Sequence, residues 1–178
     1  MRSLRKTDRL LPTTKMLILL LLSFLSVEAS NGSAQARSSS YSEDVGSSVG
    51  SHFDQLDREQ EGPITGLRIR ANDRYVVSIQ VRYGDSWSNP EGGMAGSPYN
   101  VELFLGEGIV RVLGRFGSHV EYLAFRTNQG RIFAFGSNFG PGTFFSAEPS
   151  FPNTVLRSIS GRSGSSVDAI GFHWGTEQ

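Results

Sequence analysis

The sequence contains no cysteine. Disulfides and thiolate metal sites are therefore excluded, and cysteine usage does not indicate a cellular compartment. Histidine is scarce too: His52, His119 and His173 lie on separate segments, without the short spacing at which one element presents several metal ligands. Their spacing also gives no support for a serine-histidine-aspartate arrangement. We therefore expect no metal or other cofactor and no enzymatic activity.

Lysine is nearly absent, and no hydrophobic run is long enough to cross a bilayer. The two lysines, Lys6 and Lys15, both precede the apolar run at residues 17–27. This run is too short for a membrane span and is followed by the small residues Ala29 and Ser30. Residues 1–30 are therefore predicted to be a signal peptide of a secreted protein without an integral membrane span; a membrane anchor is the alternative interpretation.

Clustered positive charge is missing from the rest of the chain. Without residues 1–30 the chain loses five of its 17 basic residues and two of its 17 acidic residues, which leaves no lysine and a net charge of about −3. Nucleic acids and sulfated polysaccharides are bound by clusters of basic residues. The composition therefore excludes nucleic acid as an expected partner and argues against a broad polyanion-binding surface.

Helical periodicity is missing outside residues 1–30, whereas 21 glycines and 12 phenylalanines accompany many short apolar runs. This composition predicts an all-β fold of one domain, which we assign to residues 45–175. Residues 31–44 are polar and are expected to form a flexible N-terminal segment or an edge segment. They begin with Asn31-Gly32-Ser33, a sequon for N-glycosylation.

Alternating apolar and polar residues predict the strands. Leu67 and Ile69 form the first alternating pair, and the second run of apolar residues follows a turn at Asn72-Asp73. That second run consists of Tyr75, Val77, Ile79, Val81 and Tyr83. Further strands are expected at 101–105, 109–113, 120–127 and 131–135. Loops are expected at 54–62, 85–100, 114–119 and 136–142.

A faint internal repeat relates three of the predicted strand pairs. Each pair closes on an aromatic residue followed by glycine, at Tyr83-Gly84, Phe135-Gly136 and Trp174-Gly175. Three similar hairpins predict three sheets. Chance repetition in a glycine-rich β protein is the alternative interpretation.

The stretch from Leu156 to Trp174 carries the functional prediction. Its second half alternates in the manner of a half-buried strand, which places Asp168 at the junction between a loop and that strand. The loop at 161–166 contains only small residues and one arginine, so its backbone N–H groups are able to converge on one point. A carboxylate beside free N–H donors suits the hydroxyl groups of a polyol. The alternative is a tight hairpin in which Asp168 caps its own turn.

Several segments together resemble the jacalin-related lectins, and within them the secreted zymogen granule protein 16 branch. These segments are QARSSSYS, GPITGLRIR, VSIQVRYG and VLRSISGRSGSSVDAIGFHWG. The resemblance covers about residues 34–175. It implies a β-prism of three four-stranded antiparallel sheets and a sugar site formed by three loops at one end of that prism.

The resemblance also implies which residues form the sugar site. The binding loop corresponds to 164–168, the glycine-rich first loop to 46–51, and the recognition loop to 115–119. Where relatives carry consecutive glycines in the first loop, this chain has Ser48 and Val49 before Gly50. Phe116 or His119 would shape the rim of the site. The implied carbohydrate-binding residues are Gly50, Ser51, Gly117, His119, Gly164, Ser165, Ser166, Val167 and Asp168.

Two functions follow from this resemblance. The first is a secreted lectin that binds mannose-type sugars of glycoproteins or cell-wall polysaccharides, with Asp168 accepting hydrogen bonds from two hydroxyl groups. The second is a packing protein of the secretory granule or extracellular matrix, which keeps the lectin fold but binds little sugar. The substituted first loop and the lysine-free surface favour the second function.

Overall fold

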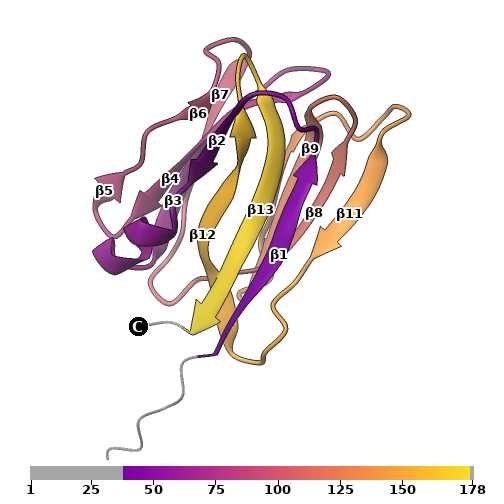
Figure 1. Ribbon diagram of the computed structural model, residues 1–178. Helices are drawn as coiled ribbons and strands as arrows, with labels where there is room; N and C mark the ends of the chain where they lie inside the picture. The colour runs from indigo at the N-terminus through magenta and orange to yellow at the C-terminus, as the bar shows by residue number, and fades with distance from the viewer. Residues whose placement is uncertain (1–37, 177–178) are drawn as a thin grey trace, which may run out of the picture. The chain divides into compact units, whose positions relative to one another are not determined.

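Antiparallel strands form nearly all the regular structure of residues 38–176, the part of the chain that the computed structural model describes. The strands form three sheets, with the orders β1-β13-β12-β2, β10-β9-β8-β11 and β5-β4-β3-β7 (Figure 1). In the third sheet, β5 and β6 pair in turn with the same edge of β4, so two short strands share the fourth position. The predicted all-β fold of three four-stranded sheets is therefore confirmed.

The first sheet contains β1 (Ser39–Gly46), β2 (Ser51–Asp54), β12 (Thr154–Ser163) and β13 (Val167–Thr176). The second contains β8 (Ile109–Phe116), β9 (Val120–Thr127), β10 (Ile132–Gly136) and β11 (Thr143–Ala147). The third contains β3 (Ile64–Ala71), β4 (Val76–Tyr83), β5 (Ser86–Trp87), β6 (Glu91–Gly92) and β7 (Ser97–Glu102). A 3-10 helix, η1 (Leu56–Glu61), follows β2.

The inner faces of the three sheets share one hydrophobic core. Leu67 and Ile79 come from the third sheet, Leu123 and Phe125 from the second, and Trp174 from the first, and all five are almost fully buried. These residues lie at alternate positions of their strands, because successive side chains of a strand point to opposite faces. This shared core therefore fixes the positions of the strand ends to which the loops are attached.

The predicted repeat corresponds to three hairpins in three different sheets. These hairpins are β3-β4, β9-β10 and β12-β13, and each ends near one of the aromatic-glycine pairs. The expectation that similar hairpins indicate separate sheets is therefore confirmed.

Some predicted boundaries were wrong. Residues 39–44, expected to form a flexible or an edge segment, belong to β1, an edge strand of the first sheet, because they pair with β13 from Ser39 opposite Gly175 onward. The strand expected at 101–105 lies earlier, in β7, and Leu105 is fully exposed. The segment at 54–62 contains η1, and 85–100 contains β5, β6 and the start of β7. The predicted signal peptide at 1–30 and Asn31 lie outside the described residues.

Alternation also failed at the start of β4. A bulge opposite Arg70 and Ala71 shifts the register, so Val76 takes a core position that the pattern assigned to its neighbours. Tyr75 therefore stays in the turn before β4 and does not join the core.

Candidate functional site

Three loops meet at one end of the sheets. They connect β1 to β2, β8 to β9 and β12 to β13, and Figure 1 shows the β12–β13 loop beside the chain that leaves β1. Two contacts to one residue join them. Ser47 N–H donates to the Asp168 carbonyl over 3.0 Å, and His119 contacts the Asp168 carboxylate. The three loops that the sequence implied therefore lie together around Asp168.

Asp168 lies second in β13, between Val167 and Ala169, which are both buried. Its own side chain is only 3% exposed. The Oδ2 atom lies against the backbone of Gly50 on one side and of Gly164 on the other, since a Cβ on Gly50 would overlap it and a Cβ on Gly164 would lie 3.4 Å away. Glycine at both positions therefore lets two loops approach the carboxylate.

His119 occupies the other carboxylate oxygen. Its Nδ1 atom lies 2.5 Å from Asp168 Oδ1, and 29% of its side chain is exposed. The ring also meets the edge of Tyr75, with centroids 4.8 Å apart and planes at 71°. A ligand hydroxyl that binds Oδ1 must therefore displace this imidazole or share the oxygen with it.

The first loop keeps glycine where its backbone requires it. Gly46 and Gly50 have φ angles of +140° and +81°, which residues with a side chain rarely adopt. Ser48 and Val49 have no positive φ and are exposed at the tip of the loop. The substitutions at these two positions therefore do not strain the loop.

Arg162 holds the first loop in place, and sequence reasoning missed this role. Its guanidinium donates to the carbonyls of Val49 over 3.2 Å and of Gly50 over 2.9 Å. Arg162 belongs to β12, opposite His52 of β2, and not to a loop as the glycine-serine composition indicated. A strand residue therefore restrains Gly50 against Asp168.

A fourth segment reaches the site from β6 and the residue after it. Glu91 Oε2 accepts a hydrogen bond from the Ser163 hydroxyl over 3.2 Å, and a Cβ on Gly93 would overlap the Ser165 carbonyl. Burial raises the pKa of Glu91, and the hydrogen bond from Ser163 partly opposes that rise. No motif in the sequence indicated these contacts, because β6 is only two residues long.

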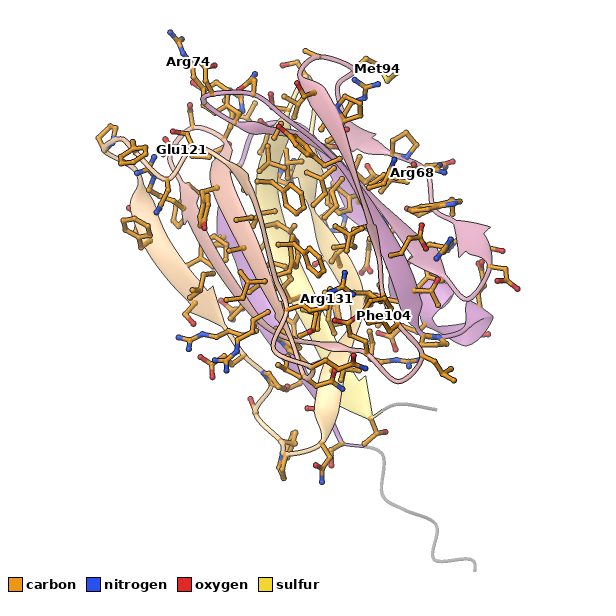
Figure 2. The ribbon with its side chains drawn as sticks, turned by 180° about the vertical axis from the view of Figure 1, so that it is seen from behind. Arg68, Arg74, Met94, Phe104, Glu121 and Arg131 are labelled. Atoms are coloured by element: carbon orange, nitrogen blue, oxygen red, sulfur yellow. The ribbon has the colours of Figure 1, made fainter. Side chains whose placement is uncertain are left out.

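The recognition loop is shorter than predicted. Arg115 and Phe116 belong to β8, so only residues 117–119 form the connection to β9. Arg115 is buried and pairs with Glu121 over 2.8 Å, which removes it from a binding rim. Figure 2 shows Glu121 at the same end of the molecule as Arg74, which precedes Tyr75.

The β12–β13 turn closes without help from the Asp168 side chain. Gly164 N–H donates to the Ser166 carbonyl over 3.0 Å, and the Asp168 carboxylate pairs instead with His119. This geometry disfavours the turn-capping alternative. Ser165 lies exposed at the turn, and Ser51 lies exposed opposite Ser163.

Within residues 38–176, no group of three or more histidine, aspartate or glutamate side chains is arranged to hold a metal ion. No helix in the same range has the length and hydrophobicity needed to cross a membrane.

Comparison with known sequences gives one family match. The family model described as a jacalin-like lectin domain matches residues 42–173. Zymogen granule membrane protein 16 of Rattus norvegicus is 47% identical over 161 residues, which are 90% of this chain and 95% of the relative. The protein of the same name from Homo sapiens is 46% identical over 159 residues, or 89% of this chain and 94% of the relative.

Solved structures agree with this match. The crystal structure of a prostate-specific WGA16 glycoprotein lectin has a TM-score of 0.67 and 33% identity, and the match covers 78% of this chain and 100% of that chain. A single-residue variant of Malaysian banana lectin has a TM-score of 0.63 and 26% identity, with 76% and 96% covered. Artocarpin in complex with mannotriose, at 24% identity and a TM-score of 0.63 over 76% and 97%, is similar in fold.

Proposed function

Because the chain belongs to the jacalin-like lectin family, we propose that it is a secreted lectin that binds mannose-type glycans through Asp168. Membership of this family makes the chain a carbohydrate-binding protein and not an enzyme. The sugar, the residues that bind it and the secretion of the chain are parts of the proposal. The observation that carries it is the convergence of three loops on one carboxylate.

The chemistry of this carboxylate suits a pair of neighbouring hydroxyl groups. An ionised carboxylate accepts several hydrogen bonds and donates none, so each of its oxygens takes one hydroxyl of a sugar. Asp168 Oδ2 lies against Gly50 and Gly164, and Asp168 Oδ1 becomes free when the sugar displaces His119. Backbone N–H groups of Gly50, Ser166 and Val167 are the proposed donors, with Gly117 and Ser51 at the edge of the site.

Binding of one monosaccharide is expected to be weak. A few hydrogen bonds to a charged group contribute about 1.5–3 kcal/mol each, and the loss of ligand freedom and the displacement of His119 oppose them. The balance corresponds to a Kd of about 1 mM. Clustered glycans would then be the physiological ligand, because several weak contacts add up to useful avidity.

The relatives support a place in the secretory pathway. Two of them are named zymogen granule membrane protein 16, and the match spans 95% and 94% of their lengths. The predicted signal peptide at 1–30 agrees with this assignment. We propose that the chain enters the lumen of a secretory granule and reaches the extracellular space.

The contact between His119 and Asp168 favours a second function, in which the chain binds little sugar. The His119 imidazole already occupies Asp168 Oδ1, and the Asp168 side chain is only 3% exposed. A protein whose carboxylate stays covered would keep the lectin fold but act in packing granule or matrix contents. In that case mannosides would not bind at any accessible concentration.

The test is Asp168→Asn. This change keeps the size of the side chain but removes its charge and turns one acceptor into a donor. Methyl α-mannoside is titrated into both proteins and followed by NMR. Under the lectin proposal, the original protein binds and the variant binds at least about tenfold more weakly, a loss of about 1.4 kcal/mol or more.

Equal binding by the two folded proteins would remove Asp168 from the site. The absence of binding by the original protein, on a glycan array as well, would favour the packing function.

A further inference from the structure

A pocket opens on the outer face of the β1-β13-β12-β2 sheet, far from the three loops. It has a volume of about 560 Å³, and its lining includes Tyr41, Leu56, Glu59, Arg157, His173 and Gly175. Tyr41 pairs with His173 near the end of β13, whereas Gly46 pairs with Ala169 near its beginning. The pocket and Asp168 therefore lie toward opposite ends of β13, the strand that runs down the face shown in Figure 1.

Arg157 forms the buried side of this pocket. It lies at a bulge in β12, between Leu156 and Ser158, and only 3% of the residue is exposed. Its Nη2 atom donates to the Glu59 carbonyl over 3.2 Å. Its Nη1 atom is buried without a partner among the described residues, and no carboxylate in that part of the chain forms an ion pair with it.

A buried guanidinium with a free nitrogen requires an acceptor. A buried guanidinium carries a positive charge, and its burial costs free energy unless its N–H groups meet acceptors. Water bound at Nη1 would satisfy one N–H group, but an acceptor that carries negative charge also offsets the buried positive charge. Glycine at position 175 leaves room for the Arg157 side chain, because a Cβ on Gly175 would lie only 3.1 Å from the Cγ atom of Arg157.

His173 supplies a second polar atom to the same pocket. Its ring stacks on Tyr41, with centroids 4.4 Å apart and planes at 22°, which sets the orientation of the imidazole. Its Nε2 atom is buried and has no hydrogen-bond partner among residues 38–176. Two residues on neighbouring strands that line this pocket, Arg157 and His173, therefore each carry a buried nitrogen, Nη1 and Nε2, without a partner among the described residues.

We propose that this pocket binds a carboxylate group, carried by a small organic acid or by an acidic sugar. A carboxylate offers two coplanar oxygens, one for Arg157 and one for His173 with its proton on Nε2, and its binding requires the groups that cover these two nitrogens to move aside. The Glu59 carboxylate belongs to the same pocket lining and accepts a hydrogen bond from the Ser158 hydroxyl over 2.7 Å, so it repels a doubly charged phosphate more strongly than a singly charged carboxylate. Leu56 and Tyr41, both partly exposed at the pocket, contact the carbon skeleton of the ligand. This site is independent of the proposed sugar site.

The experiment compares three ligands: sodium acetate, sodium glucuronate and glucose. Glucuronate and glucose differ in one carboxylate, which makes glucose the matched control. Binding is followed through the NMR signals of the His173 imidazole and the Trp174 indole, which line the pocket. We expect saturable shifts with acetate and glucuronate but not with glucose. Similar affinities for the two acids identify a small acid as the ligand class, and tighter binding of glucuronate identifies an acidic sugar.

Arg157→Met removes the charge and keeps much of the side-chain volume. Replacement of a buried charge by an apolar side chain of similar size is often tolerated, so the variant should fold. It should bind glucuronate at least about tenfold more weakly. Arg126→Met is the control, because Arg126 is exposed on β9 and its loss changes the net charge equally. It should bind as the original protein does.

Two further variants keep the proposal open to refutation. Leu56→Trp fills the mouth of the pocket at an exposed position and should also weaken binding, which tests the site even if Arg157→Met fails to fold. Asp168→Asn should leave acetate binding unchanged, which separates this site from the sugar site. Absence of acetate and glucuronate binding, equal binding by Arg157→Met, or equal binding of glucose would each overturn the proposal.

Discussion

His119 is expected to limit sugar binding, and His119→Ala tests this expectation. The substitution removes the imidazole that lies 2.5 Å from Asp168 Oδ1 and leaves that oxygen to a sugar hydroxyl. It also removes the edge contact of Tyr75. In the proposed site, His119 competes with the sugar for Asp168 and does not assist its binding.

The magnitude follows from the contact that the sugar must replace. A hydrogen bond to a charged group contributes about 1.5–3 kcal/mol, and the partial exposure of His119, at 29% of its side chain, places this contact at the low end or below. Water that hydrates the freed oxygen offsets part of the gain. We therefore expect about 1 kcal/mol, which corresponds to a roughly fivefold lower Kd for methyl α-mannoside.

The Kd is measured on the folded proteins by isothermal titration calorimetry and by NMR. His52→Ala is the matched control, because His52 is an exposed histidine of β2 and makes no recorded contact with Asp168. Its Kd should equal that of the original protein. A His119→Ala protein that keeps its fold but binds mannoside more weakly would refute the reasoning, since His119 would then orient Asp168 or contact the sugar itself.

Three other substitutions give separate predictions. Gly50→Ala should abolish mannoside binding in NMR titrations, because a Cβ at a φ of +81° would overlap Asp168 Oδ2; normal binding would contradict this geometry. Burial opposes ionisation of Glu107, but hydrogen bonds from the Phe104 N–H and Arg131, together with the charge of Arg131, lower its pKa below 4.5. The contribution of ionised Glu107 to stability is therefore present above pH 4.5 and is lost as the pH falls through the lower pKa of the folded state. Glu107→Gln should have a lower melting temperature than the original protein at pH 7, and it should lose less stability between pH 5 and pH 3. A parallel decline of both proteins would exclude that role. Burial raises the pKa of Glu91, so its ionised form costs stability as the pH rises above 4.5, and Glu91→Gln should melt at a higher temperature at pH 7; a lower melting temperature would contradict this sign.

The opposite end of the molecule shows how the Glu107 contact is built. Arg131 lies above the rings of Phe104 and Phe133, with its guanidinium carbon 4.2 Å and 4.5 Å from their centroids. Figure 2 shows Arg131 close to Phe104. These cation-π contacts hold Arg131 where it donates to Glu107 over 2.6 Å. Glu107→Gln should therefore lower stability at neutral pH by roughly 1.5–3 kcal/mol, the usual range for a hydrogen bond to a charged group.

The sequence by itself determined the longer strands of the three hairpins and the position of Asp168 at the start of one of them. These features are local, because alternation along a strand places Ile170, Phe172 and Trp174 on one face and thereby sets the residues before them. The three aromatic-glycine pairs are local features too, and they predicted three hairpins. Alternation failed where a bulge changed the register, at the start of β4, and no residue there signals a bulge.

Only the tertiary structure decided which residues surround Asp168. His119 lies 49 positions earlier in the chain, and Arg162 reaches carbonyls more than a hundred positions away. The unpartnered nitrogens of Arg157 and His173 are likewise known only once β1, β12, β13 and η1 are packed together. Such contacts depend on how three sheets close around a shared core, and the alternation of residues within one strand carries no information about its partners in another sheet.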